Sequence, residues 1–286
     1  MRFVTFGTAD GARVGVVDGD DIVDLTVIAS EAPATLKQLI AGGVPDGLAE
    51  RAASAPASAR HPLAGAKLLQ PIPDAGKLIC IGLNYHDHAE ETGQQVPDYP
   101  AVFMRASTSL LAAGEPMIVP RVSGQLDYEA ELVIVIGRRC RHVREADALD
   151  HVFGYTCLNE GTVRDYQRKS SQWTVAKNFD GTGPIGPWVT TADEVPPGAE
   201  GLRIRAILNG KVMQDASTSI MIFSVAKIVS TLSEVMTLEP GDLISTGTPA
   251  GVGVGRTPPV WLKPGDTITI DIEGVGTLAN PVAAEN

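Results

Sequence analysis

Hydrophobic residues fall in short runs along most of the chain, many of them alternating with polar residues, and this pattern is typical of β-strands. A longer period, with apolar residues three or four positions apart, predicts one amphipathic helix at 224–237 with Ser224 as its N-cap. Because helices do not separate the strands regularly, we expect a β-rich α+β fold. Short strands are expected within the first 25 residues and at 78–82, 101–105, 131–137, 154–159, 202–210, 242–247 and 266–278.

The N-terminal quarter of the chain has its own organisation. After the first short strands, helices are expected at 35–41 and 46–53, and a segment rich in Ala, Ser and Pro follows them. That composition is typical of a connector. We therefore expect a small N-terminal α+β domain at 1–74 and a larger domain at 75–286.

Composition excludes several classes of protein. The formal net charge of −11 argues against nucleic acid as a partner. No apolar run approaches the length of a membrane span, and the N-terminus lacks the apolar region of a signal peptide, so we expect a cytoplasmic protein that binds no membrane. Of the three cysteines, which lack metal-site spacing, Cys80 and Cys157 lie in strand-like apolar surroundings and are expected to be reduced core residues.

Acidic residues stand at the entry to the expected strand 131–137. Side chains two positions apart on a strand share a face, so Asp127, Glu129 and Glu131 would lie together, with the Cβ atoms of the two glutamates roughly 7 Å apart. Carboxylates entering a buried strand are costly unless a positive charge lies among them. The pattern by itself fits a cation site and a solvated strand end equally well.

Other polar segments also follow expected strands. His88 and Glu91 are three residues apart, so on a helix they could form a general base and its orienting carboxylate, although a solvated loop explains them as well. The segment "LNEGTVRDYQ" offers Glu160, Arg164, Asp165 and Gln167 to a ligand cage, although a surface patch of Arg164 and Asp165 explains it as well. Lys177 suits either a substrate anion or a solvated surface.

The segment "STGTPAGVG" at 245–253 is rich in Gly and Thr and also follows an expected strand. Backbone N–H groups and Thr hydroxyls at such a turn can hold an anion, but the segment could equally be a tight turn. It lacks the Gly-Lys-Ser/Thr ending of a P-loop. The sequence also contains no zinc spacing, G-x-S-x-G elbow or Rossmann fingerprint.

Taken in order, eight segments between about 77 and 283 resemble the fumarylacetoacetate hydrolase family. They are "GLNYHDHAEE", "FMRAST", "LDYEAELVIVIGRRC", "GYTCLNEGTVRDYQ", "AKNFDGTGPIGPWV", "LNGKVMQDASTSIMIFS", "LEPGDLISTGTPAGVG" and "KPGDTITIDIEGVGTLANPV". The resemblance implies a mixed β-sandwich roll with the active site at one mouth, and a homodimer.

The resemblance also implies a divalent metal, usually Mg²⁺, with Mn²⁺ or Ca²⁺ as alternatives. Its ligands by position are Glu129, Glu131 and Glu160, and hard oxygen donors suit these ions. Glu160 stands where the commoner family pattern has Asp. The matching catalytic dyad is His88 and Glu91.

Further roles carry over by matching position. Lys177 is the third expected catalytic residue, and Arg105, Gln167 and Thr248 are expected to contact the substrate. Arg105 stands where many relatives have Lys. Asp127 takes no ligand role from the family, so we expect it to be solvated or to support a ligand.

The family's substrates are mostly 2,4-dioxo acids, so we expect a metal-dependent hydrolase that cleaves a C–C bond of an acylpyruvate, in aromatic or sugar acid catabolism. His88, oriented by Glu91, would activate water, and Lys177 would add positive charge near the enolate that leaves. Because an enolate is common to several reactions, an oxaloacetate decarboxylase and a 2-hydroxymuconate-type isomerase or hydratase are the alternatives. A non-catalytic metal-binding or acid-binding protein would not need the dyad.

Overall fold

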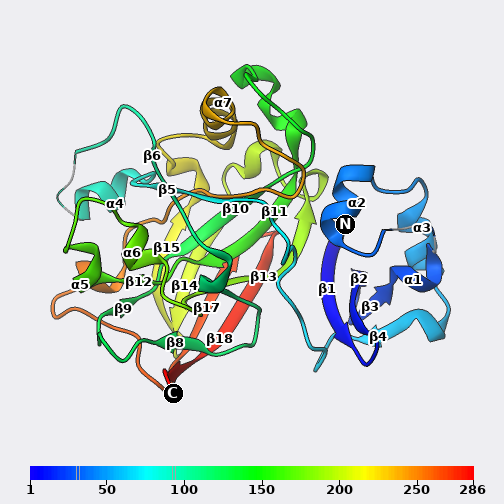
Figure 1. The fold of residues 1–286 in the computed structure, drawn as a ribbon, viewed down its shortest axis with the longest axis horizontal. Helices are drawn as coiled ribbons and strands as arrows, with labels where there is room; N and C mark the ends of the chain where they lie inside the picture. The colour runs from blue at the N-terminus through cyan, green and yellow to red at the C-terminus, as the bar shows by residue number, and fades with distance from the viewer. Residues whose placement is uncertain (30, 32, 92, 94) are drawn as a thin grey trace.

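The computed structural model describes residues 1–286 except 30, 32, 92 and 94. Within this part of the chain, strands form an eleven-stranded sheet, a five-stranded sheet and a small two-stranded sheet (Figure 1). This architecture confirms the predicted β-rich α+β fold. In spatial order the largest sheet contains β4 (Arg60–Pro62), β3 (Asp21–Asp24), β2 (Gly11–Asp18), β1 (Arg2–Thr8), β13 (Gly183–Thr191), β11 (Val152–Asn159), β10 (Ala130–Ile136), β16 (Leu243–Ser245), β5 (Leu78–Gly82) and β6 (Ala101–Met104), with β7 (Leu110–Leu111) beside β13.

The second layer is the five-stranded sheet, which packs against the central strands of the large sheet. The single strand expected at 266–278 is in fact a hairpin, because residues 273–275 turn the chain and Gly274 takes a positive φ of 72°. This sheet contains β15 (Lys211–Ser217), β14 (Arg203–Leu208), β17 (Thr267–Ile272), β18 (Gly276–Ala284) and β8 (Met117–Val119), and β9 (Leu126–Asp127) pairs with β12 (Thr162–Val163) in the two-stranded sheet.

Strand β10 lies at the centre of the fold and is buried along its whole length. Leu132, Ile134 and Ile136 pack into the core between the two sheets. Val133 and Val135 face the opposite way, into a second core shared with the N-terminal helices. Both faces of the strand are therefore covered, which explains why its sequence is an unbroken apolar run.

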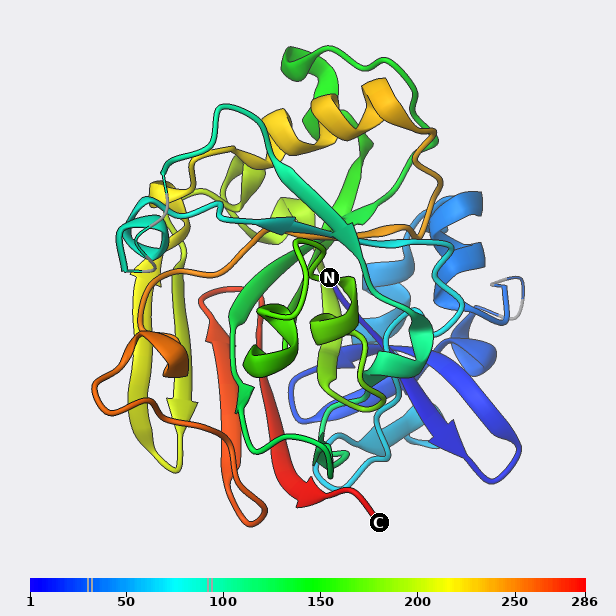
Figure 2. The ribbon, with the colours of Figure 1, turned by 60° about the vertical axis from the view of Figure 1, so that its left-hand side comes forward.

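The longest helix, α7 (Val225–Val235), lies beside η3 (Glu145–His151) at one end of the molecule (Figure 2). Ser224 caps α7 as predicted, since its side chain accepts a hydrogen bond from the backbone N–H of Lys227. The other helical segments are α1 (Leu25–Ile28), α2 (Leu36–Gly42), α3 (Leu48–Ala53), α4 (His86–Glu91), α5 (Arg164–Gln167), α6 (Thr174–Lys177), η1 (Ala57–Ala59), η2 (Ser107–Ser109), η4 (Ala192–Glu194), η5 (Pro197–Ala199), η6 (Thr218–Ile220) and η7 (Gly253–Gly255). Among the described residues no helix is long and apolar enough to cross a membrane.

The N-terminal segment, drawn in blue in Figure 1, extends the large sheet. Strand β1 pairs antiparallel with β13, where Arg2 lies opposite Thr190 and Phe3 opposite Val189. Helices α1 to α3 cover one face of this extension, and their buried residues join the second core. The expected domain boundary at residue 74 stays a prediction, because one continuous sheet runs across it.

Candidate active site

A cavity of about 420 Å³ opens where the ends of β5, β10 and β11 meet α4, α5 and α6. Eight of the nine residues predicted from the sequence to act in catalysis, metal binding or substrate binding line it, and Arg105 is the exception. The lining residues are Ile81, Gly82, Leu83, His88, Glu91, Phe103, Glu129, Glu131, Glu160, Arg164, Gln167, Arg168, Trp173, Lys177, Thr248, Val254 and Gly255.

Three carboxylates meet at the bottom of this cavity. Glu129 and Glu131 flank the start of β10, and Glu160 directly follows β11. Pairing of Ala130 with Asn159 brings the two strand ends together, so that one oxygen from each glutamate lies within 4.8 Å of the others. Each residue is at most 3% exposed, which rules out the solvated strand end that the sequence had left open.

Lys177 joins two of these carboxylates. Its Nζ donates to Glu129 Oε2 at 2.5 Å and to Glu160 Oε2 at 2.8 Å. Burial disfavours the charged form of Glu129, but the positive charges of Lys177 and Arg164 outweigh it and lower the pKa of Glu129 to about 2. Burial likewise opposes the charge on Lys177, yet the adjacent carboxylates raise the pKa of its ammonium. The lysine is therefore held as a cation inside the acid cluster.

Among the described residues, no cation forms an ion pair with Glu131. Its Oε2 accepts hydrogen bonds from Ser245 Oγ at 2.5 Å and from the backbone N–H of Gly247 at 2.9 Å. Burial, followed by repulsion from Glu160 and Glu129, raises the pKa of Glu131 well above its ordinary value. This carboxylate is the member of the cluster that a further positive charge would stabilise most.

The donor set fits a divalent cation. Oxygen Oε1 of Glu160 is buried and accepts no hydrogen bond from any described residue. The cluster, with the neighbouring Asp127, formally holds four carboxylates against two cations, Lys177 and Arg164, an excess of two negative charges. Carboxylate oxygens are the ligands that Mg²⁺, Mn²⁺ and Ca²⁺ prefer. Glu129, Glu131 and Glu160 are therefore the residues that would hold such an ion.

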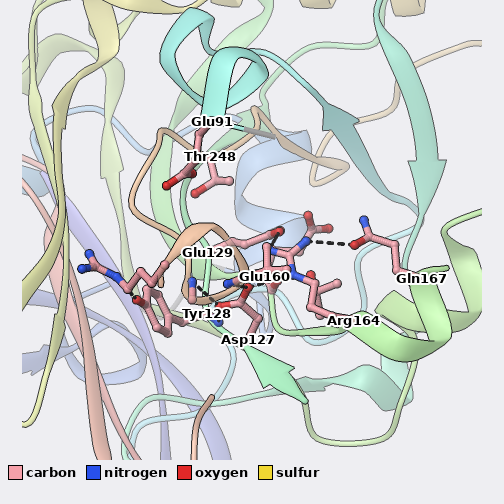
Figure 3. A network of polar contacts seen from close by, with 12 residues as sticks. Glu91, Asp127, Tyr128, Glu129, Glu160, Arg164, Gln167 and Thr248 are labelled. Atoms are coloured by element: carbon pink, nitrogen blue, oxygen red, sulfur yellow. Dashed lines mark hydrogen bonds and ion pairs between the residues drawn. The ribbon is translucent and has the colours of Figure 1, made fainter. Parts of the chain in front are cut away.

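Arg164, which the sequence offered either to a ligand cage or to a surface patch, is buried inside this site. Its Nε donates to Asp127 Oδ2 at 2.7 Å, and its Nη2 forms an ion pair with Glu129 Oε1 at 2.6 Å (Figure 3). Asp127 is completely buried, so the expectation that it might be solvated is wrong. Besides Arg164, it accepts hydrogen bonds from the backbone N–H groups of Gly253 and Val254. Asp127 thus holds Arg164, which in turn pairs with Glu129.

The predicted dyad forms in the structure. The segment containing it is helical, as α4, and His88 Nδ1 lies 3.5 Å from Glu91 Oε2. His88 is 7% exposed, whereas the neighbouring His86 is exposed to solvent. A carboxylate beside Nδ1 favours the tautomer with its proton on Nδ1, which leaves Nε2 as the nitrogen that can accept a proton.

One glycine-rich loop connects the acid cluster with the dyad. The sequence suggested that backbone N–H groups of 245–253 could hold an anion, and in the structure the anions they hold are the protein's own carboxylates. Gly247 donates to Glu131, and Gly251 donates to Glu91 at 3.0 and 3.1 Å. Figure 3 shows Glu91 and Thr248 on one side of the cluster. Thr248 in turn accepts a hydrogen bond from Gln214.

The other expected substrate ligands take different positions. Gln167 lines the cavity and accepts a hydrogen bond from Arg164 Nη1 at 3.0 Å. Arg105 is buried outside the lining, and its guanidinium donates to Ser109 Oγ, to the backbone oxygen of Gly161 and to Thr182 Oγ1. A role for Arg105 in substrate binding stays a prediction that these contacts do not favour.

Aromatic residues form an apolar wall of the cavity. The rings of Phe103 and Trp173 meet edge to face, with centroids 5.8 Å apart. Trp173 lies directly against the backbone of Gly82, where any Cβ would overlap the indole ring. The absence of a side chain at Gly82 therefore leaves room for the indole ring of Trp173 beside the end of β5.

A carboxylate cluster suited to a divalent cation and a His–Glu pair, sharing one cavity at the mouth of a β-rich fold, define a class of enzyme. The chain belongs to the fumarylacetoacetate hydrolase family, since residues 77–283 match the family described as fumarylacetoacetate (FAA) hydrolase C-terminal. The resemblance inferred from the sequence is confirmed over the range in which it was predicted.

The names of similar proteins state different activities. The mitochondrial oxaloacetate tautomerase fahd2 of Xenopus laevis is 38% identical over 290 residues, covering 99% of this chain and 90% of that protein. Oxaloacetate tautomerase YisK of Bacillus subtilis is 43% identical over 228 residues, covering 78% of this chain and 75% of that protein. The structure of maleylpyruvate hydrolase from Sphingobium sp. SYK-6, in complex with manganese(II) ion and pyruvate, is similar with a TM-score of 0.82 and 35% identity, with full coverage of both chains. Family membership therefore leaves the reaction type open.

Proposed function

We propose that this protein interconverts the keto and enol forms of a 2-keto dicarboxylic acid, and that oxaloacetate is the substrate. Two relatives named oxaloacetate tautomerase support the reaction, and one of them is similar along nearly the whole chain. The substrate class is supported by a single feature of the cavity, the guanidinium of Arg168. This proposal differs from the acylpyruvate cleavage expected from the sequence, which becomes the second candidate.

Of the Lys and Arg residues lining the cavity, Arg168 is the one that pairs with no carboxylate of the described chain. Lys177 and Arg164 also line the cavity, but both already pair with buried glutamates. No hydrogen bond or ion pair joins the Arg168 side chain to another residue in the described part of the chain, and Arg168 is exposed at the end of α5. A guanidinium in this state can bind a carboxylate through two parallel hydrogen bonds. We therefore assign Arg168 to the second carboxylate of the substrate.

The chemistry requires one proton to move between C3 and the oxygen on C2. A divalent cation on Glu129, Glu131 and Glu160 would supply Lewis acidity toward the substrate's oxygens. His88 Nε2 removes the C3 proton, the C–H electron pair forms the C2–C3 double bond, and the carbonyl electrons move to oxygen. Lys177 contributes positive charge near that oxygen. Transfer of the proton from the His88 imidazolium to the oxygen through solvent gives the enol and restores neutral His88, and the reverse sequence returns the keto acid.

Glu91 keeps the imidazole of His88 oriented during this transfer. Its carboxylate lies beside Nδ1 and is itself held by the backbone N–H of Gly251. It also stabilises the imidazolium that forms when His88 accepts the proton. The Glu91–His88 pair therefore provides a base that can both accept the proton and return it.

Hydrolysis of a C–C bond in a 2,4-dioxo acid is the second candidate, and the maleylpyruvate hydrolase with manganese(II) and pyruvate favours it. In that reaction His88 would deprotonate a water molecule, which attacks a carbonyl before the C–C bond breaks. The two reactions share the enolate but differ in whether water enters the product. Assays with enol-oxaloacetate and with an acylpyruvate, both with added Mg²⁺, separate them directly.

The experiment that tests the proposal follows the ultraviolet absorbance of enol-oxaloacetate as it converts to the keto form. Wild-type protein is expected to accelerate this decay, and Arg168→Met to lower kcat/KM roughly tenfold or more, because a charge-assisted hydrogen bond is lost. The enol of phenylpyruvate, which has a single carboxylate, should be converted equally by both proteins. Lys169→Met is the matched control, since that neighbouring cation stacks on Tyr166. Equal losses for both substrates would refute the role of Arg168, and no acceleration by wild type would refute the tautomerase.

A further inference from the structure

Glu91 is held in place by a loop that comes from a distant part of the sequence. Both of its carboxylate oxygens accept from the backbone N–H of Gly251, at 3.0 and 3.1 Å, across 160 positions of sequence. Gly251 has a φ of 101°, and a Cβ there would overlap the backbone oxygen of Met213. Only glycine can therefore present this N–H group at this point.

The other side of Gly251 is held as firmly. Its backbone oxygen accepts from Tyr128 Oη at 3.1 Å and from Arg256 Nε and Nη2 at 3.3 and 3.2 Å. Arg256 also donates from Nη2 to the backbone oxygen of Met213 at 2.5 Å and from Nε to Tyr128 Oη at 3.2 Å. One guanidinium thus fixes Gly251 against a neighbouring strand, although Arg256 does not line the cavity.

Gly255 lies against the side chain of Glu91 on a second side. A Cβ at this position would lie 2.5 Å from Glu91 Cδ and Oε1, and 2.7 Å from Cγ. The φ of Gly255 is outside the positive range, so its backbone would accept alanine. A methyl group there would displace the carboxylate of Glu91 from its observed position without changing any charge.

We propose, resting on the role proposed above for His88, that Arg256 is a positioning residue of the reaction. It acts through Gly251 and Glu91, and sets the imidazole of His88 toward the substrate. Gly255 also positions Glu91, because the absence of a side chain at 255 leaves the space that the Glu91 carboxylate occupies. No hydrogen bond or ion pair of the described residues joins Arg256 or Gly255 to Glu129, Glu131 or Glu160, so we expect cation binding to be independent of this positioning.

The test is a set of double-mutant cycles. Arg256→Met and Gly255→Ala should each lower kcat roughly five- to tenfold, the kinetic equivalent of one hydrogen bond, with KM little changed. In a Glu91→Ala background, which removes the three atoms nearest to a Cβ at position 255, both substitutions should have no further effect. Gly42→Ala, where a Cβ meets no atom within 4 Å, is the matched control for Gly255→Ala and should match wild type.

Two readouts separate positioning from general damage. Mn²⁺ affinity, measured by calorimetry, should be the same in Arg256→Met, Gly255→Ala and wild type. The ring ¹⁵N signals of His88 in metal-free protein should shift in both variants toward those of Glu91→Ala. This spectrum needs no substrate, so it tests whether Arg256 and Gly255 position His88 even if the protein converts no oxaloacetate. Losses that add in the double variants, or His88 signals that stay at their wild-type positions, would overturn the proposal.

Discussion

Replacement of Arg164 by methionine should destabilise the protein severely. Its guanidinium lies between two buried acids, 2.7 Å from Asp127 and 2.6 Å from Glu129, and all three side chains are at most 4% exposed. Methionine restores much of the aliphatic volume, so the cavity left behind is small. The main cost falls on two buried carboxylates, since Asp127 loses its cation and Glu129 keeps only Lys177, and breaking one such buried pair typically costs about 3–5 kcal/mol. We expect the free energy of unfolding to fall by at least that amount.

The assay is urea denaturation in the presence of a chelator, so that no added cation compensates the carboxylates. Arg139→Met is the matched control, because Arg139 pairs with Glu239 at 2.9 Å while 72% exposed. That exposed pair should contribute about 0–1 kcal/mol. Adding Asp127→Asn to Arg164→Met should recover part of the stability, since it removes one stranded charge. Equal losses in Arg164→Met and Arg139→Met would refute the assignment of Arg164 as the counterion of the site.

Two further predictions concern the cation and the N-terminal segment. Glu131→Ala should abolish Mn²⁺ binding in calorimetry while the circular dichroism stays that of the wild type, and Glu145→Ala, at an exposed acid, should bind Mn²⁺ normally. Burial opposes ionisation of Asp24, but hydrogen bonds from Arg13 and Thr26 outweigh this effect and lower the pKa of Asp24. The ionised carboxylate therefore stabilises the folded protein at pH values above the ordinary pKa of about 4, and this stabilisation is lost as the pH falls below that value. Denaturation curves of Asp24→Asn should therefore show a smaller loss of stability than wild type on acidification below about pH 4, and an identical loss would contradict the role given to Asp24.

Local periodicity predicted the parts of the site that lie on one element. The alternation of a strand placed Glu129 and Glu131 on one face, and the i, i+3 spacing of a helix paired His88 with Glu91. In both cases the residues that interact are neighbours in sequence. The positions of several strands along the chain and the amphipathic helix at 224–237 were also predictable, because their patterns depend on burial alone.

The parts that the sequence did not predict depend on contacts between distant segments. Arg164 meets Asp127 because β12 pairs with β9, which places Thr162 opposite Asp127, and no spacing in the sequence carries that pairing. The segment after Lys177 is rich in Gly and Pro, a composition that favours a loop, yet β13 crosses the centre of the large sheet there. The pairing of β13 with β11 shifts register between Tyr155 and Cys157, and this shift accommodates the Gly and Pro residues within β13. The small residues of β13 reflect close approach of neighbouring chain segments.

The most direct test of the central claim, proton transfer at C3 by His88, is the stereochemistry of that transfer. Enol-oxaloacetate is converted in D₂O with Mg²⁺, the keto acid is trapped at once by malate dehydrogenase and NADH, and the C3 deuterium of the malate is located by NMR. A base fixed on one side of the substrate predicts that deuterium enters a single face with wild-type protein. His88→Ala should lose roughly 10²–10⁴-fold in rate, the usual contribution of a general base, and return the mixture that forms without enzyme. An equal mixture from wild-type protein, at the uncatalysed rate, would contradict the account.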